Sequence, residues 1–211
     1  AQKAWGDGIV KIAAAHTSGG NYVQTATDHI NTLYAYATST VLFKPTLAAT
    51  EQFRPTFDKA LSYFVASNNA SPEDAGFAIK GWTAVRFENV DIITVGSVGM
   101  AMGNYLFTKP KVFDANKDGT ATKVEYSFGY MLDADDNVRI NLHHSSMPYA
   151  ASDASSDDDD ADPAVAPTEM TKELVEAAQK AWGDGIVKIA AAHTAGGDYV
   201  KTAEDHINTL Y

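Results

Sequence analysis

The chain has 211 residues, of which 45% are hydrophobic and 20% are charged, and these proportions are typical of a globular protein. It contains no cysteine, which excludes disulfides, thiolate nucleophiles and cysteine-ligated metal sites. The formal net charge of −11 argues against nucleic acid as a partner, and no apolar run approaches the roughly 20 residues that span a bilayer.

The beginning and the end of the chain are two copies of one sequence. Residues 1–34 and 178–211 are identical except for four substitutions, Ser18/Ala195, Asn21/Asp198, Gln24/Lys201 and Thr27/Glu204. A repeat separated by about 180 residues has the size of a whole domain rather than of a solenoid unit. We therefore expect one module at residues 1–149 and the helical start of the next module, truncated, at residues 169–211.

Residues 150–168 are predicted to be an acidic, disordered linker between the two copies. This stretch consists almost entirely of Ala, Ser, Asp, Pro and Thr and includes the run Asp157–Asp160. Such a composition buries too little apolar surface to offset the entropy of ordering it. Either Thr168 or Thr171 is expected to cap the helix that follows.

The first half of the module is predicted to be helical. Residues 1–16 place Trp5, Ile9, Ile12 and His16 on one helical face, and residues 21–36 form a second helix. A strand at residues 38–44 ends at a proline, and Pro55 opens a third, short helix. From residue 77 the hydrophobic period becomes two, which predicts strands at residues 78–89, 92–98, 100–108, 123–132 and 138–146.

Helices followed by consecutive antiparallel strands predict an α+β fold. In such a fold a curved antiparallel sheet wraps around the N-terminal helices and buries its inner face against them.

Residues Asp114–Glu125 match the spacing of a calcium-binding EF-hand loop. An EF-hand loop lies between two helices, whereas both flanks here have the period of strands. The pattern therefore favours a polar hairpin turn over a calcium site.

The end of the last predicted strand carries the run His143-His144-Ser145-Ser146. Because side chains alternate along a strand, His143 shares a face with Ser145, and His144 shares the other face with Ser146. The two histidines therefore cannot chelate one metal from a regular strand. His144 has the parity of the apolar residues Val138, Ile140 and Leu142, which favours His144 and Ser146 as the inward pair. The alternatives are that the polar face itself lines a pocket, or that one histidine is a core residue and the other a surface residue.

Two further polar residues are candidates for a site. Thr46 follows a strand and a proline, which hold its hydroxyl in a fixed loop. Tyr63 lies among apolar residues of the third helix, where it is either a pocket residue or a core tyrosine with one hydrogen bond.

The segments Phe43–Leu47, Phe77–Thr83, Val90–Ile93 and Leu142–Pro148 together resemble the iota class of carbonic anhydrases. The domain of that class is similar to the association domain of calmodulin-dependent kinase II and to the cone of nuclear transport factor 2. The resemblance covers essentially all of residues 1–149, and the His-His-Ser-Ser run is its most specific part.

This resemblance implies reversible hydration of CO2 to bicarbonate in a pocket lined by a Thr, a Tyr, a His and a Ser. The closest positions are Thr46, Tyr63, one of His143 and His144, and the serine two residues later, Ser145 or Ser146. A shortage of metal ligands favours a metal-free site, in which hydroxyls hold a water and a histidine relays a proton. The alternative is a divalent metal such as Zn or Mn.

Two other functions are compatible with such a fold. The domain could be a non-catalytic oligomerisation or scaffold domain, or a different pocket enzyme in which Asp91 pairs with a histidine. The resemblance also implies a homodimer, for which exchange of the C-terminal repeat helix is one route. Algal members of the class suggest a plastid location.

Overall fold

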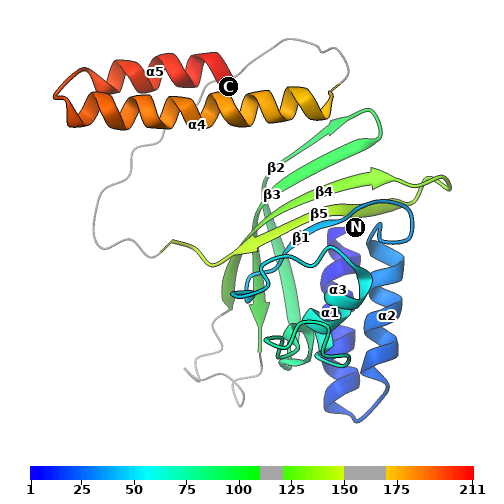
Figure 1. The fold of residues 1–211 in the computed structure, drawn as a ribbon. Helices are drawn as coiled ribbons and strands as arrows, with labels where there is room; N and C mark the ends of the chain where they lie inside the picture. Colours follow the sequence, from blue (N-terminus) through cyan, green and yellow to red (C-terminus); the bar gives the residue numbers. More distant parts are fainter. Residues whose placement is uncertain (110–120, 150–169) are drawn as a thin grey trace. The chain divides into compact units, whose positions relative to one another are not determined.

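A computed structural model of the chain describes residues 1–109, 121–149 and 170–211 (Figure 1). Its contacts divide the chain into two units, Ala1–Ala151 and Ser152–Tyr211, which are described separately below. The linker predicted at residues 150–168 lies outside the described residues, so the domain boundaries stay a prediction. None of the described helices is long and apolar enough to cross a membrane.

Three of the four helices described in the first unit lie where the sequence predicts them, and the fourth, a 3₁₀ helix, was not predicted. They are α1 (Gln2–Thr17), α2 (Tyr22–Leu33), α3 (Phe57–Val65) and a short 3₁₀ helix, η1 (Phe77–Ile79). Asn21 caps α2 by accepting a hydrogen bond from the backbone amide of Gln24. Thr56 caps α3 in the same way through the amide of Lys59.

Five strands form one sheet in the order β1-β5-β4-β3-β2. Their bounds are Leu42–Lys44 (β1), Ala84–Val95 (β2), Val98–Thr108 (β3), Thr122–Leu132 (β4) and Val138–Ser146 (β5). Strands β2 to β5 pair antiparallel with their neighbours in chain order, and β1 adds to β5 in parallel.

The predicted strands at residues 78–89 and 92–98 are wrong as separate elements. Residues 84–95 form the single strand β2, in which Val90 lies at a register shift between Asn89 and Asp91, and Val98 already begins β3. The extra residue interrupts the alternation of side chains, so the hydrophobic pattern of this one strand looks like that of two strands with a break between them. Ala78 belongs to η1 instead.

The sheet curves around the helices, as the α+β prediction requires (Figure 1). Trp5, Ile9 and Ile12 of α1 are buried, and Trp5 packs against aromatic rings of the sheet, whereas His16 on the predicted apolar face is exposed. Gly8 allows α1 and α2 to approach closely, because a Cβ at this position would lie 2.0 Å from His29 Nδ1. A glycine that weakens the isolated helix is therefore needed for the packing of His29.

The second unit is a helical hairpin of α4 (Lys172–Thr194) and α5 (Tyr199–Leu210). Of the two predicted capping residues, Thr171 caps α4 by accepting a hydrogen bond from the backbone amide of Leu174. Its sequence repeats that of α1 and α2, but its environment differs: Trp182 is 49% exposed where Trp5 is 1% exposed. Burial of this apolar face therefore depends on a sheet to pack against.

Candidate active site

A β-bulge decides which of the two histidines faces the interior. In the pairing of β4 with β5, Tyr130 lies opposite Ile140 and Gly129 opposite Leu142, so Asn141 is an extra residue. The bulge reverses the alternation of β5 after Ile140. Gly129 provides the space, since a Cβ on it would lie 2.8 Å from the Cβ of Leu142.

The inward pair is consequently His143 and Ser145, which are 2% and 3% exposed. The prediction that favoured His144 and Ser146 as the inward pair is wrong, because it extended the parity of Ile140 through a strand assumed to be regular. His144 is exposed and lies on the outer face of the sheet, among the residues that line two surface clefts there. Ser146 Oγ donates a hydrogen bond to Glu125 Oε2 at 3.1 Å.

Two phenyl rings enclose the imidazole of His143. The ring of Phe43 stacks on one side at a centroid distance of 4.6 Å, and the ring of Phe128 stacks at 4.2 Å. This apolar enclosure lowers the pKa of His143 well below its ordinary value of 6.5, chiefly by desolvation. The imidazole is therefore neutral at pH 7.

A chain of hydrogen bonds passes through this neutral imidazole. Trp5 Nε1 donates to Tyr34 Oη at 2.9 Å, and Tyr34 Oη lies 2.8 Å from His143 Nδ1. Among the described residues, the Tyr34 hydroxyl proton has no acceptor other than His143 Nδ1, so the tautomer that satisfies both groups has Tyr34 donating to Nδ1 and the imidazole proton on Nε2. His143 Nε2 lies 3.4 Å from the hydroxyl of Tyr105, toward which it points that proton.

Two aliphatic hydroxyl groups lie at the end of this series of hydrogen bonds. Thr46 Oγ1 donates to Ser145 Oγ at 2.9 Å, which joins a loop and a strand that are 99 residues apart in sequence. Both hydroxyls also lie close to the Tyr105 side chain, where they offset part of the rise in its pKa that burial causes. The structure therefore brings Thr46, His143 and Ser145 together around Tyr105.

Tyr63 reaches the same cluster from α3. Its ring stacks on Phe77 and meets Phe43 edge-on, at centroid distances of 5.6 and 5.7 Å. Its hydroxyl interacts with the backbone amides of Leu47 and Thr46, which belong to the loop that carries the Thr46 side chain.

All the tyrosines of the cluster are kept protonated. Burial raises the pKa of Tyr34, Tyr63 and Tyr105 well above the ordinary value of 10, and nearby hydrogen bonds offset only part of this shift. The cluster therefore consists of neutral hydroxyl groups and a neutral imidazole in an aromatic shell. Such an array of donors suits an uncharged apolar substrate that becomes an oxyanion.

Trp5, Tyr34 and Tyr105 belong to this cluster, although the sequence did not mark them. Each looks like an ordinary apolar position in a helix or strand, so only their tertiary contacts reveal them. The one sequence signal is that Tyr105 has the inward parity of its strand, shared with Ala101 and Phe107.

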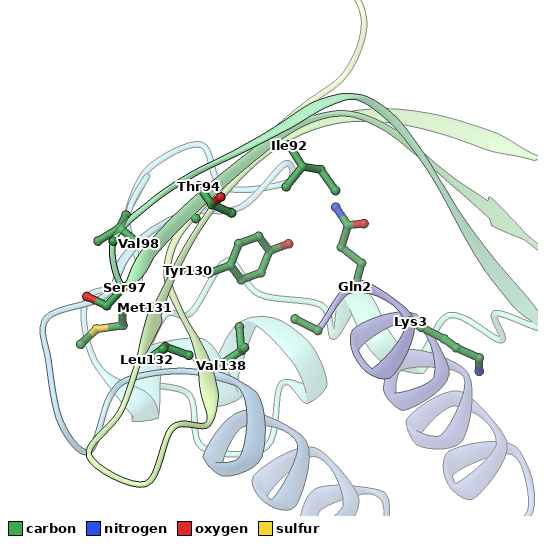
Figure 2. Close-up of a pocket in the computed structure, with 13 residues that line it drawn as sticks. Gln2, Lys3, Ile92, Thr94, Ser97, Val98, Tyr130, Met131, Leu132 and Val138 are labelled. Carbon is green, nitrogen blue, oxygen red and sulfur yellow. The ribbon is translucent and has the colours of Figure 1, made fainter. Parts of the chain in front are cut away.

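An apolar cleft of about 480 Å³ lies elsewhere, where the start of α1 meets the sheet (Figure 2). Tyr130 points into it, toward Gln2, and its lining includes Ile92, Val98 and Leu132. None of Thr46, Tyr63, His143 and Ser145 lines this cleft, so it is separate from the candidate site.

Metal ligands do not gather in the described part of the chain. Across residues 1–109, 121–149 and 170–211, no three His, Asp or Glu side chains are close enough to hold one metal ion. The calcium loop considered at Asp114–Glu125 lies mostly outside the described residues. Asp91 is exposed and its carboxylate accepts from the backbone amide of Ile92, which does not support its pairing with a buried histidine.

Comparison with known proteins gives the family. Residues 1–147 and 173–211 match the family described as metal-independent carbonic anhydrase. The chain belongs to this family. A metal-independent carbonic anhydrase from Nostoc sp. (strain PCC 7120 / SAG 25.82 / UTEX 2576) is 39% identical over 152 residues, which are 71% of this chain and 71% of the relative.

A solved structure of a relative supports the fold as well. It is the iota-carbonic anhydrase from a cyanobacterium complexed with bicarbonate, with 37% identity and a TM-score of 0.65 over 71% of this chain and 89% of the other. The resemblance to the iota class is thereby confirmed, as is the expectation of a metal-independent carbonic anhydrase.

Proposed function

We propose that this carbonic anhydrase hydrates CO2 at the cluster formed by Thr46, Tyr63, Tyr105 and Ser145. The observation that carries the proposal is the partly buried hydrogen bond between Thr46 and Ser145, which lies beside protonated tyrosines. A relative of the same family is known in complex with bicarbonate, and bicarbonate requires donors of this kind. The alternative of a purely structural scaffold leaves this polar cluster in the aromatic core unexplained.

The aromatic shell suits the substrate. CO2 is small, linear and without a net dipole, so it enters an apolar site with little loss of hydration. Partial negative charge builds on the oxygens of CO2 as water attacks the carbon, and hydroxyl donors stabilise that charge as it develops. Tyr63 and Tyr105 supply donors that cannot ionise at neutral pH, since burial raises the pKa of both.

The paired hydroxyls offer a route for the proton. A water oxygen attacks the carbon of CO2 and forms the new C–O bond, while the water gives one proton to the hydroxyl oxygen of Ser145 or Thr46. That hydroxyl passes its own proton to an oxygen of CO2, so the first product is neutral carbonic acid. Carbonic acid then loses a proton to solvent and leaves as bicarbonate. No free hydroxide forms at any stage, which suits a site built of neutral groups.

His143 acts through Tyr105 in this scheme. Its buried Nδ1 accepts from Tyr34 and its Nε2 proton is directed at the Tyr105 oxygen, which leaves the Tyr105 proton free for the reacting oxygens. In this proposal the role replaces the proton relay by a histidine that the sequence suggested, because a fully enclosed imidazole is a poor proton shuttle.

The reaction is tested by exchange of ¹⁸O between labelled CO2 and water, followed by mass spectrometry. Chelator-treated protein is expected to accelerate the loss of label, and a Thr46→Ala, Ser145→Ala variant is expected to lose that acceleration. Full exchange activity in the variant would place the chemistry elsewhere in the molecule.

A homodimer is the proposed assembly. The outer face of the sheet exposes Leu42, Met100 and Met102, which are 64%, 43% and 60% exposed. The hairpin of the second unit exposes Trp182 and Ile186. Light scattering after chromatography distinguishes the two surfaces: Met102→Glu is expected to yield monomers if the sheets pair, and deletion of residues 169–211 is expected to change the size if the hairpin is exchanged. An unchanged mass in both variants would contradict the assembly.

A plastid location also stays a proposal. It is supported by the resemblance to algal members, and imaging of the tagged full-length protein in its native cell would test it.

A further inference from the structure

The loop that carries Thr46 is held in place by a single carboxylate. Glu73, which follows α3, accepts hydrogen bonds from three consecutive backbone amides of this loop. Its Oε2 lies 2.9 Å from the nitrogens of Ala49 and Thr50, and its Oε1 lies 2.8 Å from that of Glu51. Together these contacts fix the path of the loop only three residues beyond Thr46.

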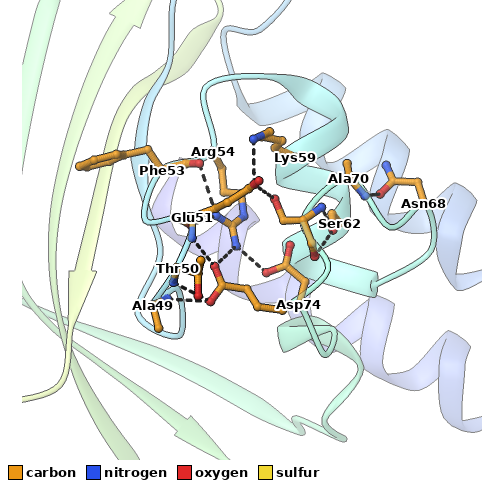
Figure 3. A network of polar contacts seen from close by, with 12 residues as sticks. Ala49, Thr50, Glu51, Phe53, Arg54, Lys59, Ser62, Asn68, Ala70 and Asp74 are labelled. Carbon is orange, nitrogen blue, oxygen red and sulfur yellow. Dashed lines mark hydrogen bonds and ion pairs between the residues drawn. The ribbon is translucent and has the colours of Figure 1, made fainter.

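A buried arginine fixes the other end of the same loop. Arg54 is completely buried, and its Nη2 lies 2.6 Å from Asp74 Oδ1. Its Nη1 donates to the backbone carbonyls of Glu51 and Phe53, so the side chain folds back over its own loop (Figure 3). Glu73 and Asp74 are adjacent in sequence, and they bind the loop at both of these points.

The main chain of Arg54 is tied to the aromatic shell of the site. Its amide donates to the carbonyl of Phe43 at 2.8 Å, and its carbonyl accepts from the hydroxyl of Tyr36 at 2.7 Å. Phe43 stacks on His143, and Tyr36 stacks on Tyr34. The guanidinium also lies over the ring of Tyr63, 5.9 Å from its centroid. Arg54 therefore contacts Tyr63 directly and also binds Phe43, which stacks on His143.

Stability alone is a weak reason for such an arrangement. A buried ion pair costs desolvation that its attraction rarely exceeds, and apolar residues of similar volume often replace one without loss. Here Arg54 Nε and Asp74 Oδ2 are buried and have no hydrogen-bond partner among the residues that the structure describes, which adds to that cost. What the pair does secure is the position of the loop relative to α3, the helix that carries Tyr63.

We propose that Glu73, Asp74 and Arg54 are positioning residues for CO2 hydration, which hold the Thr46 hydroxyl at a fixed distance from Tyr63 and Ser145. The proposal rests on the proposed function and extends it to residues that do not touch the substrate. Hydrogen bonds from the amides of Thr50 and Ala49 keep the pKa of Glu73 below its usual range, with a smaller contribution from Arg54. The Glu73 carboxylate is therefore ionised throughout the neutral pH range.

Glu73→Ala and Glu73→Gln test the proposal in stopped-flow CO2 hydration at 10 °C. Alanine removes all three contacts and is expected to lower kcat about tenfold, because small misplacements of a reacting group have large effects on rate. Glutamine retains an oxygen for two of the amides and is expected to lower kcat only about threefold. The KM for CO2 should stay within twofold in both variants, since the apolar shell that admits the substrate is intact.

Asp133→Asn provides the matched control. Asp133 also accepts from main-chain amides, those of Asp135 and Asn137, and pairs with Arg139 at 2.7 Å, but it lies in the turn between β4 and β5. This variant is expected to lower the unfolding temperature and leave kcat unchanged. A third variant, Arg54→Lys, retains the positive charge but loses the planar fork and is expected to behave like Glu73→Ala.

The graded loss of kcat, absent from the control, would support the proposal. If Glu73→Gln and Arg54→Lys keep the kcat of the wild type and show only a lower unfolding temperature, the proposal is overturned. The contacts of Glu73, Asp74 and Arg54 would then serve stability alone. If Glu73→Ala does not fold, the decision rests on those two milder variants. Inactivity of the wild-type chain would instead overturn the proposed function, and the positioning role with it.

Discussion

The inner and outer faces at the end of β5 carry the same two residue types in opposite environments. His143 and Ser145 are buried among aromatic rings, whereas His144 is exposed and Ser146 binds a surface carboxylate. The inner imidazole is held neutral between Phe43 and Phe128 and is bound at both nitrogens. The difference shows that burial and partners, rather than the identity of the side chains, determine which pair can serve the reaction.

One extra residue in the strand produces this difference. Without the bulge at Asn141, the alternation from Ile140 would turn His144 and Ser146 inward and His143 and Ser145 outward. The predictions below test whether the inner face alone has the chemistry, beginning with the largest expected effect.

Replacing two inner hydroxyls should have the largest effect. A Thr46→Ala, Tyr63→Phe variant removes one hydroxyl relay and one oxyanion donor, and we expect kcat/KM for CO2 to fall on the order of 10³-fold. Tyr22→Phe, a tyrosine outside the cluster on α2, is the control and should stay within twofold of the wild type. Equal activity of both variants would show that the inner cluster is not the site.

Buried histidines should make the fold sensitive to mild acid. Burial lowers the pKa of His29 from 6.5 to about 4, and that of His143 also lies below 6.5. The unfolded chain takes up these protons near pH 6.5 and the folded chain does not, so stability is full above pH 6.5 and declines as the pH falls toward 4. The shift at His29 alone corresponds to roughly 3 kcal/mol.

Urea unfolding between pH 7.5 and 4.5 measures this effect. The midpoint should fall across that range, and His29→Gln should flatten the decline while His16→Gln, at an exposed position, should not. A midpoint independent of pH would contradict the buried, neutral histidines.

Replacing the inner and the outer histidine separately should give unequal effects. His143→Gln loses the ordered contacts to Tyr34 and Tyr105, and we expect kcat to fall about tenfold as the Tyr105 hydroxyl loses its orientation. His144→Gln should remain within twofold of the wild type. A greater loss from His144 than from His143 would reverse the assignment of faces.

A substitution at Gly129 tests how tightly the bulge is held. A Cβ at this position would lie 2.8 Å from Leu142 Cβ and 3.1 Å from Asn141 Oδ1, so Gly129→Ala forces the bulge to shift. We expect a loss of about 1 kcal/mol of stability and a decrease in kcat of less than fivefold. Thermal unfolding with unchanged midpoint would show that the strand adjusts freely and that the bulge is not tightly held.

Much of the fold could be predicted from the sequence because hydrophobic period and capping residues are local signals. They gave α1, α2, α3 and the strand-rich second half, and the resemblance gave Thr46 and Tyr63 as site candidates. The direction of His143 could not be predicted in the same way. A bulge depends on the partner strand, here on the space left by Gly129, and single-strand parity contains no information about it.

Tyr34, Tyr105 and Trp5 escaped prediction for a related reason. Each belongs to the site only through contacts between elements far apart in the chain, and an inward aromatic residue ordinarily means core packing. The hairpin of α4 and α5 also shows that tertiary contacts decide the environment of a residue, since Trp182 has the local sequence of Trp5 but not its burial.

The most direct test compares two neighbouring serines in stopped-flow CO2 hydration with protein stripped of metal by a chelator. We predict that the stripped wild type remains active, that Ser145→Ala reduces kcat/KM by about 10²-fold, and that Ser146→Ala leaves it within twofold. Wild-type activity that returns only when a metal is added would contradict the metal-free mechanism. A loss in Ser146→Ala with Ser145→Ala unaffected would place the reaction on the outer face and contradict the account as a whole.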